Sequence, residues 1–112
     1  MKQLTFEISI PLENLTSGKT FTIDLGDDAH ILQALSEIDK YVFDHPEESC
    51  FPLYKGKIHS YLQLIWNPQK DKIYDDVGID AYGPNREFMP IKDDVRVNLI
   101  PNSKINILID AD

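Results

Sequence analysis

The residue types best suited to nucleophilic or metal chemistry are one cysteine and three histidines. Cys50 directly follows an acidic stretch, and nearby carboxylates disfavour the thiolate form that nucleophilic catalysis requires. His45 stands before it at the expected end of a helix, where a histidine is ordinarily a surface residue. His30, His45 and His59 show neither the C-x-x-C nor the H-x-x-x-H spacing of metal sites. We therefore predict no catalytic residue and no metal ligand.

Carboxylates are plentiful, but they are not arranged as a recognisable site. Asp71, Asp75, Asp76 and Asp80 lie close in sequence. They lack the D-x-D-x-D-G pattern and the later glutamate of an EF-hand calcium loop. No two acids stand out as the pair that glycoside hydrolysis uses, and the glycines form neither G-x-G-x-x-G nor a Walker loop. We expect a solvated acidic surface and predict no cofactor.

Aromatic side chains gather in the second half of the chain. Most are expected to pack in the core or across neighbouring strands. Exposed tryptophan, tyrosine and arginine are the residues most enriched at interface hot spots. A partner-binding surface is therefore predicted at Trp66, Tyr74, Tyr82 and Arg86. The alternative is that these four residues take part only in ordinary packing.

Charge and length limit the classes of partner. The 112 residues carry a formal charge of −8 and contain no basic run. Nucleic-acid binding needs a basic surface that displaces counterions, and anionic membranes attract such surfaces too, so neither partner is expected. The electrostatic complement is a basic surface on another protein. The length fits a single domain, residues 1–112, with one hydrophobic core.

Three features of the sequence predict a cytoplasmic protein. A lone cysteine cannot form an internal disulfide, which fits a reducing compartment. The first residues lack the continuous apolar stretch of a signal peptide. The longest apolar runs are far shorter than a membrane span.

Apolar residues that alternate with polar ones predict a β-hairpin at the start of the chain. The first strand covers residues 4–10 and should end at Pro11, and the second covers residues 20–25. Ser17 and Gly18 are expected to form the turn between the two strands.

Helical spacing of apolar residues predicts a helix over residues 29–43. Asp27 or Asp28 can accept backbone N–H groups as its N-cap, and both charges favour the positive end of a helix. The helix should end before Pro46, because a residue that precedes proline avoids helical geometry.

The second half of the chain is rich in strand-forming residues separated by turns. Strands are predicted over residues 58–66, 72–82, 95–99 and 105–109. A helix and a sheet each need a partner for their apolar side, so the helix should cover one face of the sheet in an α+β fold. The run at residues 105–109 would allow self-association if it lay at an edge of the sheet.

This order of elements resembles the β-grasp, or ubiquitin-like, superfamily. Residues 18–31, GKTFTIDLGDDAHI, look like the second strand and helix start of those proteins. Residues 91–101, IKDDVRVNLIP, resemble a near-terminal segment of the molybdopterin-synthase small subunit and the thiamine sulfur carrier. The resemblance implies a mixed sheet with one main helix on one face. Residues 57–90 look like an added β-hairpin insertion.

The sequence departs from that family at its end. Sulfur carriers and ubiquitin-type modifiers end in Gly-Gly, whereas this sequence contains no Gly-Gly and ends Ile109-Asp110-Ala111-Asp112. We therefore expect a non-enzymatic β-grasp module that binds another protein, or an accessory subunit of a larger complex. One alternative is a sulfur-carrier or ubiquitin-like modifier. Another is a small ligand-binding domain or enzyme whose site the sequence does not reveal.

Overall fold

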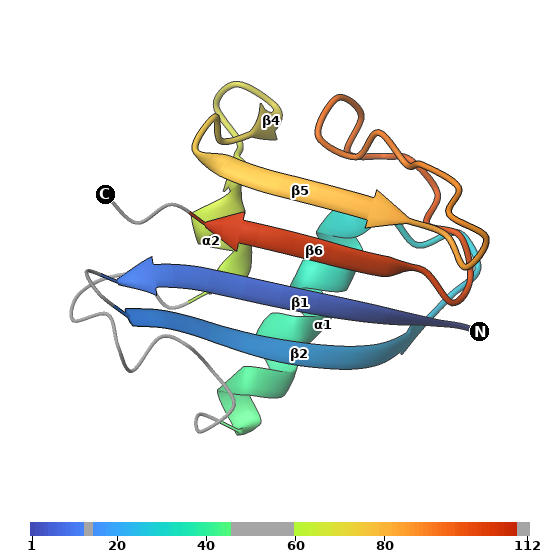
Figure 1. Cartoon of the computed structure of the whole chain (residues 1–112), viewed down its shortest axis with the longest axis horizontal. Coiled ribbons are helices and arrows are strands. Elements are labelled where there is room, and N and C mark those ends of the chain that lie inside the picture. Colours follow the sequence, from blue (N-terminus) through green and yellow to red (C-terminus); the bar gives the residue numbers. More distant parts are fainter. Residues whose placement is uncertain (13–14, 46–59, 110–112) are drawn as a thin grey trace.

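The protein is an α+β structure built on a mixed four-stranded sheet with the order β2-β1-β6-β5 (Figure 1). A computed structural model describes residues 1–12, 15–45 and 60–109. The central strands, β1 (Lys2–Leu12) and β6 (Lys104–Ile109), run parallel to each other. The outer strands, β2 (Leu15–Leu25) and β5 (Val77–Tyr82), pair antiparallel with them.

The predicted amino-terminal hairpin is confirmed, but its strands are longer than expected. Pro11 does not end β1; it lies opposite Thr16, within the pairing of β1 with β2. The last β1 residue that also pairs with β6 is Ser9, so Pro11 needs no N–H group on that side. The turn predicted at residues 17–18 is wrong, because both residues belong to β2.

The predicted main helix is confirmed as α1 (Ile31–Asp44), which crosses behind the sheet in Figure 1. It begins later than expected, because His30 is the N-cap and has an extended backbone. The N-cap prediction of Asp27 or Asp28 is therefore wrong. The His30 backbone N–H donates to Oε1 of Gln33 at 3.0 Å, which satisfies a donor at the start of the helix.

The strand predicted over residues 58–66 is wrong over residues 61–65, whereas Trp66 does lie in a strand. Residues Tyr61–Ile65 form a second helix, α2. The carboxylate of Asp39, on α1, accepts the backbone N–H groups of Tyr61 at 2.7 Å and Leu62 at 3.3 Å. This contact from a distant part of the chain satisfies the first turn of α2 and outweighs the local preference for a strand.

Two short strands follow α2 before the chain returns to the main sheet. β3 (Trp66–Asn67) pairs with β4 (Lys72–Ile73) as a separate two-stranded sheet. The single strand predicted over residues 72–82 is thus divided into β4 and β5. Residues 60–90 contribute a helix, a short hairpin and one main-sheet strand.

The strand predicted over residues 95–99 does not form. Val95 and Leu99 are buried, but the segment consists of turns and irregular chain. The Leu99 N–H donates to the carbonyl of Ala29 at 3.2 Å, just before α1. The alternation here reflects two buried side chains, Val95 and Leu99, that hold the segment against the core, and it does not indicate a strand.

The strand predicted over residues 105–109 is confirmed as β6. Because β6 has a partner on both sides, it offers no edge for pairing with a second copy of the protein. The outer edge of β5 is partly covered as well. Met89 N–H donates to the Ala81 carbonyl, and the Lys92 amino group donates to the Val77 carbonyl.

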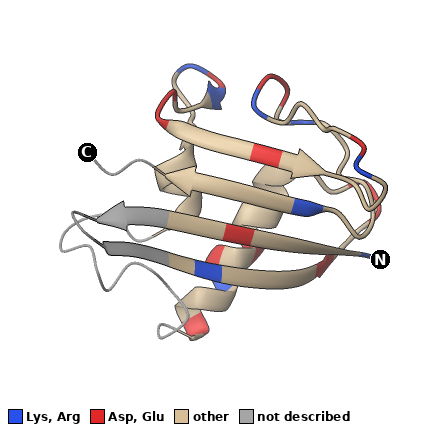
Figure 2. Cartoon of the chain, viewed as in Figure 1, with Lys and Arg blue, Asp and Glu red and all other residues tan. Residues whose placement is uncertain are grey.

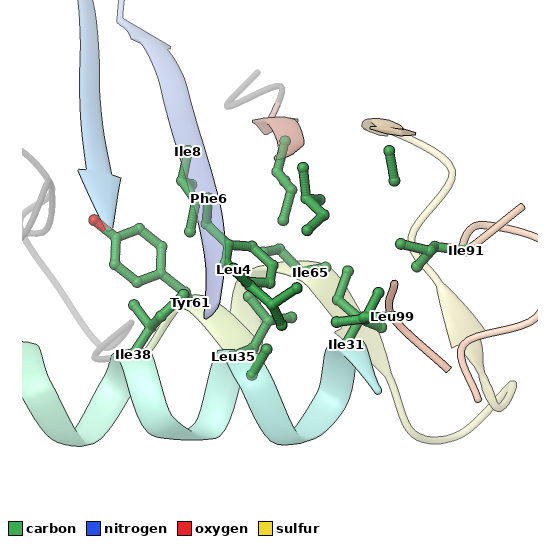
Figure 3. Close-up of a cluster of buried hydrophobic side chains, with 14 of the residues drawn as sticks. Leu4, Phe6, Ile8, Ile31, Leu35, Ile38, Tyr61, Ile65, Ile91 and Leu99 are labelled. Carbon is green, nitrogen blue, oxygen red and sulfur yellow. The ribbon is translucent and has the colours of Figure 1, made fainter. Parts of the chain in front are cut away.

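The core lies between the sheet and the two helices (Figure 3). Alternate β1 residues point toward α1, where they meet the apolar stripe of that helix. Fully buried members include Leu4, Phe6, Ile8, Leu35 and Tyr61. This packing orients the main sheet. At the positions whose side chains the structure describes, alternate residues of β1, β2, β5 and β6 face the core and the others face away from α1.

Lys2 is a buried lysine that joins three parts of the chain. Its amino group donates to the carbonyls of Asp27 and Ala29 at 2.9 Å and of Leu99 at 2.6 Å. It also donates to Oδ1 of Asn98 at 2.5 Å. Burial lowers the pKa of Lys2, and the nearby charges of Asp27 and Asp28 oppose that shift.

Candidate functional site

The sheet surface opposite α1, here called the open face, is the candidate functional site. Figure 1 views this surface directly, and no described helix or strand lies in front of it. Strand pairing arranges its outward side chains in rows that run across the sheet. In the order β2, β1, β6, β5, one row is Thr22, Thr5, Lys104, Tyr82; the next is Thr20, Glu7, Asn106, Asp80; the third is Gly18, Ser9, Leu108, Gly78.

A shallow hollow of about 180 Å³ lies across the second and third rows. Its lining includes Glu7, Asp80, Asn106, Leu108 and Gly78. Leu108 is 51% exposed although it is apolar, because it occupies an outward position of β6. Gly78 carries no side chain, and a Cβ built there would approach no closer than 4.0 Å to Leu108. The lining of the hollow thus combines apolar groups with two carboxylates.

The open face carries more negative than positive charge. Figure 2 marks an acidic residue on β1 and another on β5, on either side of strand β6, which carries a basic residue. Lys104 Nζ lies 3.9 Å from Glu7 Oε2, and both side chains are half exposed. Such a long, exposed ion pair is weak. Asp80 has no ion-pair partner among residues 1–12, 15–45 and 60–109.

The four residues predicted to bind a partner fall into two separate pairs. Trp66 and Tyr74 lie at the small β3–β4 sheet, whereas Tyr82 and Arg86 lie at and just beyond the far end of β5. Strand β5 alone separates these ends by about 17 Å at the usual rise per residue. Trp66 is partly buried and the other three are exposed. The structure therefore does not gather them into one surface.

An exposed aromatic pair stands at one end of the open face. The rings of Tyr82 and Phe88 have centroids 6.0 Å apart, and the two residues pair across an isolated β-bridge. They are 44% and 64% exposed. Phe88 was not among the predicted site residues, because only the fold brings it beside Tyr82.

A second, wider hollow lies at the start of α1. Its lining includes Asp27, Asp28, His30, Gln33 and Glu37. The Nδ1 atom of His30 is buried and has no partner in the described part of the chain. No group of three or more potential metal ligands occurs among the described residues.

The remaining candidates for chemistry are dispersed. Cys50 and His59 lie outside the described residues. His45 is exposed at the end of α1, where its ring stacks on Tyr41. Burial raises the pKa of Asp39, opposed by the N–H groups of Tyr61 and Leu62 that it accepts. That carboxylate caps α2 and therefore has a structural role.

Comparisons with known proteins give no relative for this chain: no family model, no curated protein and no solved structure matches it. Within the described ranges, no helix has the length and apolar character needed to cross a bilayer.

Proposed function

We propose that this chain is a β-grasp module that binds another protein, as an adaptor or an accessory subunit of a larger complex. The order of the sheet supports the β-grasp assignment, since the first and last strands lie parallel at its centre and one main helix covers one face. We further propose a cytoplasmic location, which the lone cysteine supports.

The observation that carries the binding role is the open face. It leaves Tyr82, Phe88 and Leu108 substantially exposed on or beside a sheet surface that no described helix or strand covers. Exposed aromatic residues next to a partly polar surface are typical of protein interfaces. The hollow on this face, about 180 Å³, is smaller than the roughly 300–1,000 Å³ of small-molecule pockets. A protein surface therefore fits the open face better than an enclosed small ligand.

Affinity capture from the native host, with intact-mass measurement of the recovered chain, tests this proposal. We expect a stoichiometric protein partner and an unmodified chain. The double variant Tyr82→Ala and Phe88→Ala should reduce capture at least tenfold, because interface aromatics contribute about 2 kcal/mol or more at hot spots. The matched control is Phe43→Ala, which removes an 85% exposed aromatic residue from α1.

Other outcomes would favour the other classes of protein. A covalent conjugate or an added sulfur atom would identify a modifier or a sulfur carrier. Recovery of the bare chain alone would contradict the binding role. Undiminished capture by the Tyr82→Ala and Phe88→Ala variant would show that the partner does not use the open face.

A further inference from the structure

The hollow on the open face has the shape and polarity of a receptor for one long basic side chain. Glu7, Asn106 and Asp80 stand side by side in one row across three strands. They offer two carboxylates and one amide oxygen as hydrogen-bond acceptors. Beside them, Leu108 and Gly78 form the apolar part of the lining. An aliphatic stem can lie along such a surface while its charged end reaches the acceptors.

Two properties of this row favour a lysine. An ammonium group has three N–H donors, and the row presents three acceptor groups. The backbones of β1 and β5 are two strand spacings apart, about 10 Å. The carboxylates of Glu7 and Asp80 nevertheless line the same hollow, and an ammonium on a flexible four-carbon stem can move between them.

The electrostatic field around the row also favours a cation. Glu7 and Asp80 flank Asn106 in the row. Lys104 is the one basic residue among the described outward positions of the open face. Its 3.9 Å contact with Glu7 is exposed and weak, so an incoming ammonium can displace it. The net charge of −8 adds attraction at longer range.

We propose that this hollow recognises a lysine side chain of the partner protein, with Glu7, Asn106 and Asp80 accepting from its ammonium and Leu108 contacting its stem. The inference rests on the proposed function, and it assigns the chemistry of the partner and the place where it docks. Tyr82 and Phe88 then contact the residues of the partner that neighbour the lysine.

The first test removes the charges without changing the shape. The double variant Glu7→Gln and Asp80→Asn should lower capture of the partner from host extract at least tenfold. The matched control, Asp44→Asn and Asp93→Asn, removes the same charge from two exposed positions away from the open face. Capture by the control should stay within twofold of that by the original chain.

The second test fills the hollow without weakening the fold. Gly78→Val places a β-branched side chain beside Leu108, at ordinary contact distance. We expect capture to fall at least tenfold while the melting temperature stays the same or rises, since valine suits a strand better than glycine. This variant separates lost binding from lost folding.

The third test identifies the contact. A zero-length carbodiimide cross-linker, applied to the captured complex, should join Glu7 or Asp80 to a lysine of the partner, as located by mass spectrometry. If the original chain captures no partner, the proposed function fails and this inference fails with it. If a partner is captured equally by the charge and filling variants, only this inference fails. Loss of capture without a cross-link at either carboxylate would overturn the assignment of a lysine.

Discussion

Replacing the buried Lys2 by methionine tests the account of how the fold is held together. The variant Lys2→Met keeps a long apolar side chain but removes the amino group that donates to four oxygen atoms. Those acceptors belong to the segment before α1 and to the irregular segment before β6. The substitution leaves acceptors that are partly or fully buried without their donor.

The expected cost follows from the number and type of these contacts. A hydrogen bond from a charged donor contributes about 1.5–3 kcal/mol net, but an ammonium has only three protons to share among four acceptors. Burial of the charge offsets part of the gain, which agrees with the lowered pKa of Lys2. A buried acceptor left without its donor costs about 1–3 kcal/mol, and two of the four acceptors, the carbonyls of Ala29 and Leu99, are fully buried, so the total is about 3–5 kcal/mol. We expect a loss in that range, which is a large fraction of a typical stability of about 5–15 kcal/mol.

Urea unfolding followed by circular dichroism measures this loss directly. Thermal unfolding gives a second measure. At roughly 4–6 °C per kcal/mol for a domain of this size, the melting temperature should fall by about 12–30 °C. The control variant Lys70→Met, at an exposed loop position, should change the free energy of unfolding by less than about 0.5 kcal/mol. A loss below about 1 kcal/mol for Lys2→Met would refute the structural role assigned to its amino group.

Four substitutions have definite expected outcomes for stability. Burial raises the pKa of Asp39 above its ordinary value of 3.8. At a pH between 3.8 and this raised pKa, the folded state binds more protons than the unfolded state, so stability falls as pH rises. Asp39→Asn should remove that slope in urea titrations carried upward from pH 3.8, and an unchanged slope would rule out Asp39 as its source. Gly83→Ala should cost about 1 kcal/mol, because its Cβ would displace the Glu87 carboxylate that accepts the Asn85 N–H. Gly26→Ala, with no atom within 4 Å, should be tolerated, and equal unfolding midpoints for the two variants would show that the Glu87 contact contributes nothing. Gly78→Val should raise stability by up to about 1 kcal/mol, and a clear destabilisation would mean that this part of β5 is more crowded than described.

Hydrophobic periodicity predicts those parts of the fold in which local pattern and tertiary packing agree. The helical stripe between Ile31 and Val42 predicts α1, and alternation predicts the hairpin and β6. Alternation failed at Val95 and Leu99, where it marks buried anchors in a turn-rich segment. The helix α2 could not be predicted locally, because its first turn depends on a carboxylate more than 20 residues away in sequence.

The candidate site was only partly visible in the sequence. Tyr82 was predicted from its residue type, but Glu7, Asp80 and Asn106 become neighbours only through the register of β1, β6 and β5. One signal was available: Leu108 places an apolar side chain at a position where the alternation of β6 calls for a polar one. An apolar residue on the solvent side of a strand is a reason to examine that surface as an interface.

The central pairing of β1 with β6 has a consequence for the synthesis of the protein on the ribosome. β1 emerges before β6, so its pairing with β6 cannot form until β6 has been synthesised. Likewise, the Lys2 amino group cannot donate to the Leu99 carbonyl until that residue, 97 positions further along the chain, has been added. Contacts this distant in sequence make folding slow, because a long loop must close before they form. Until β6 emerges, one side of β1 is an unpaired edge and its apolar face lacks part of its cover. The nascent chain is therefore most exposed to misfolding and to chaperone binding in the interval before β6 emerges.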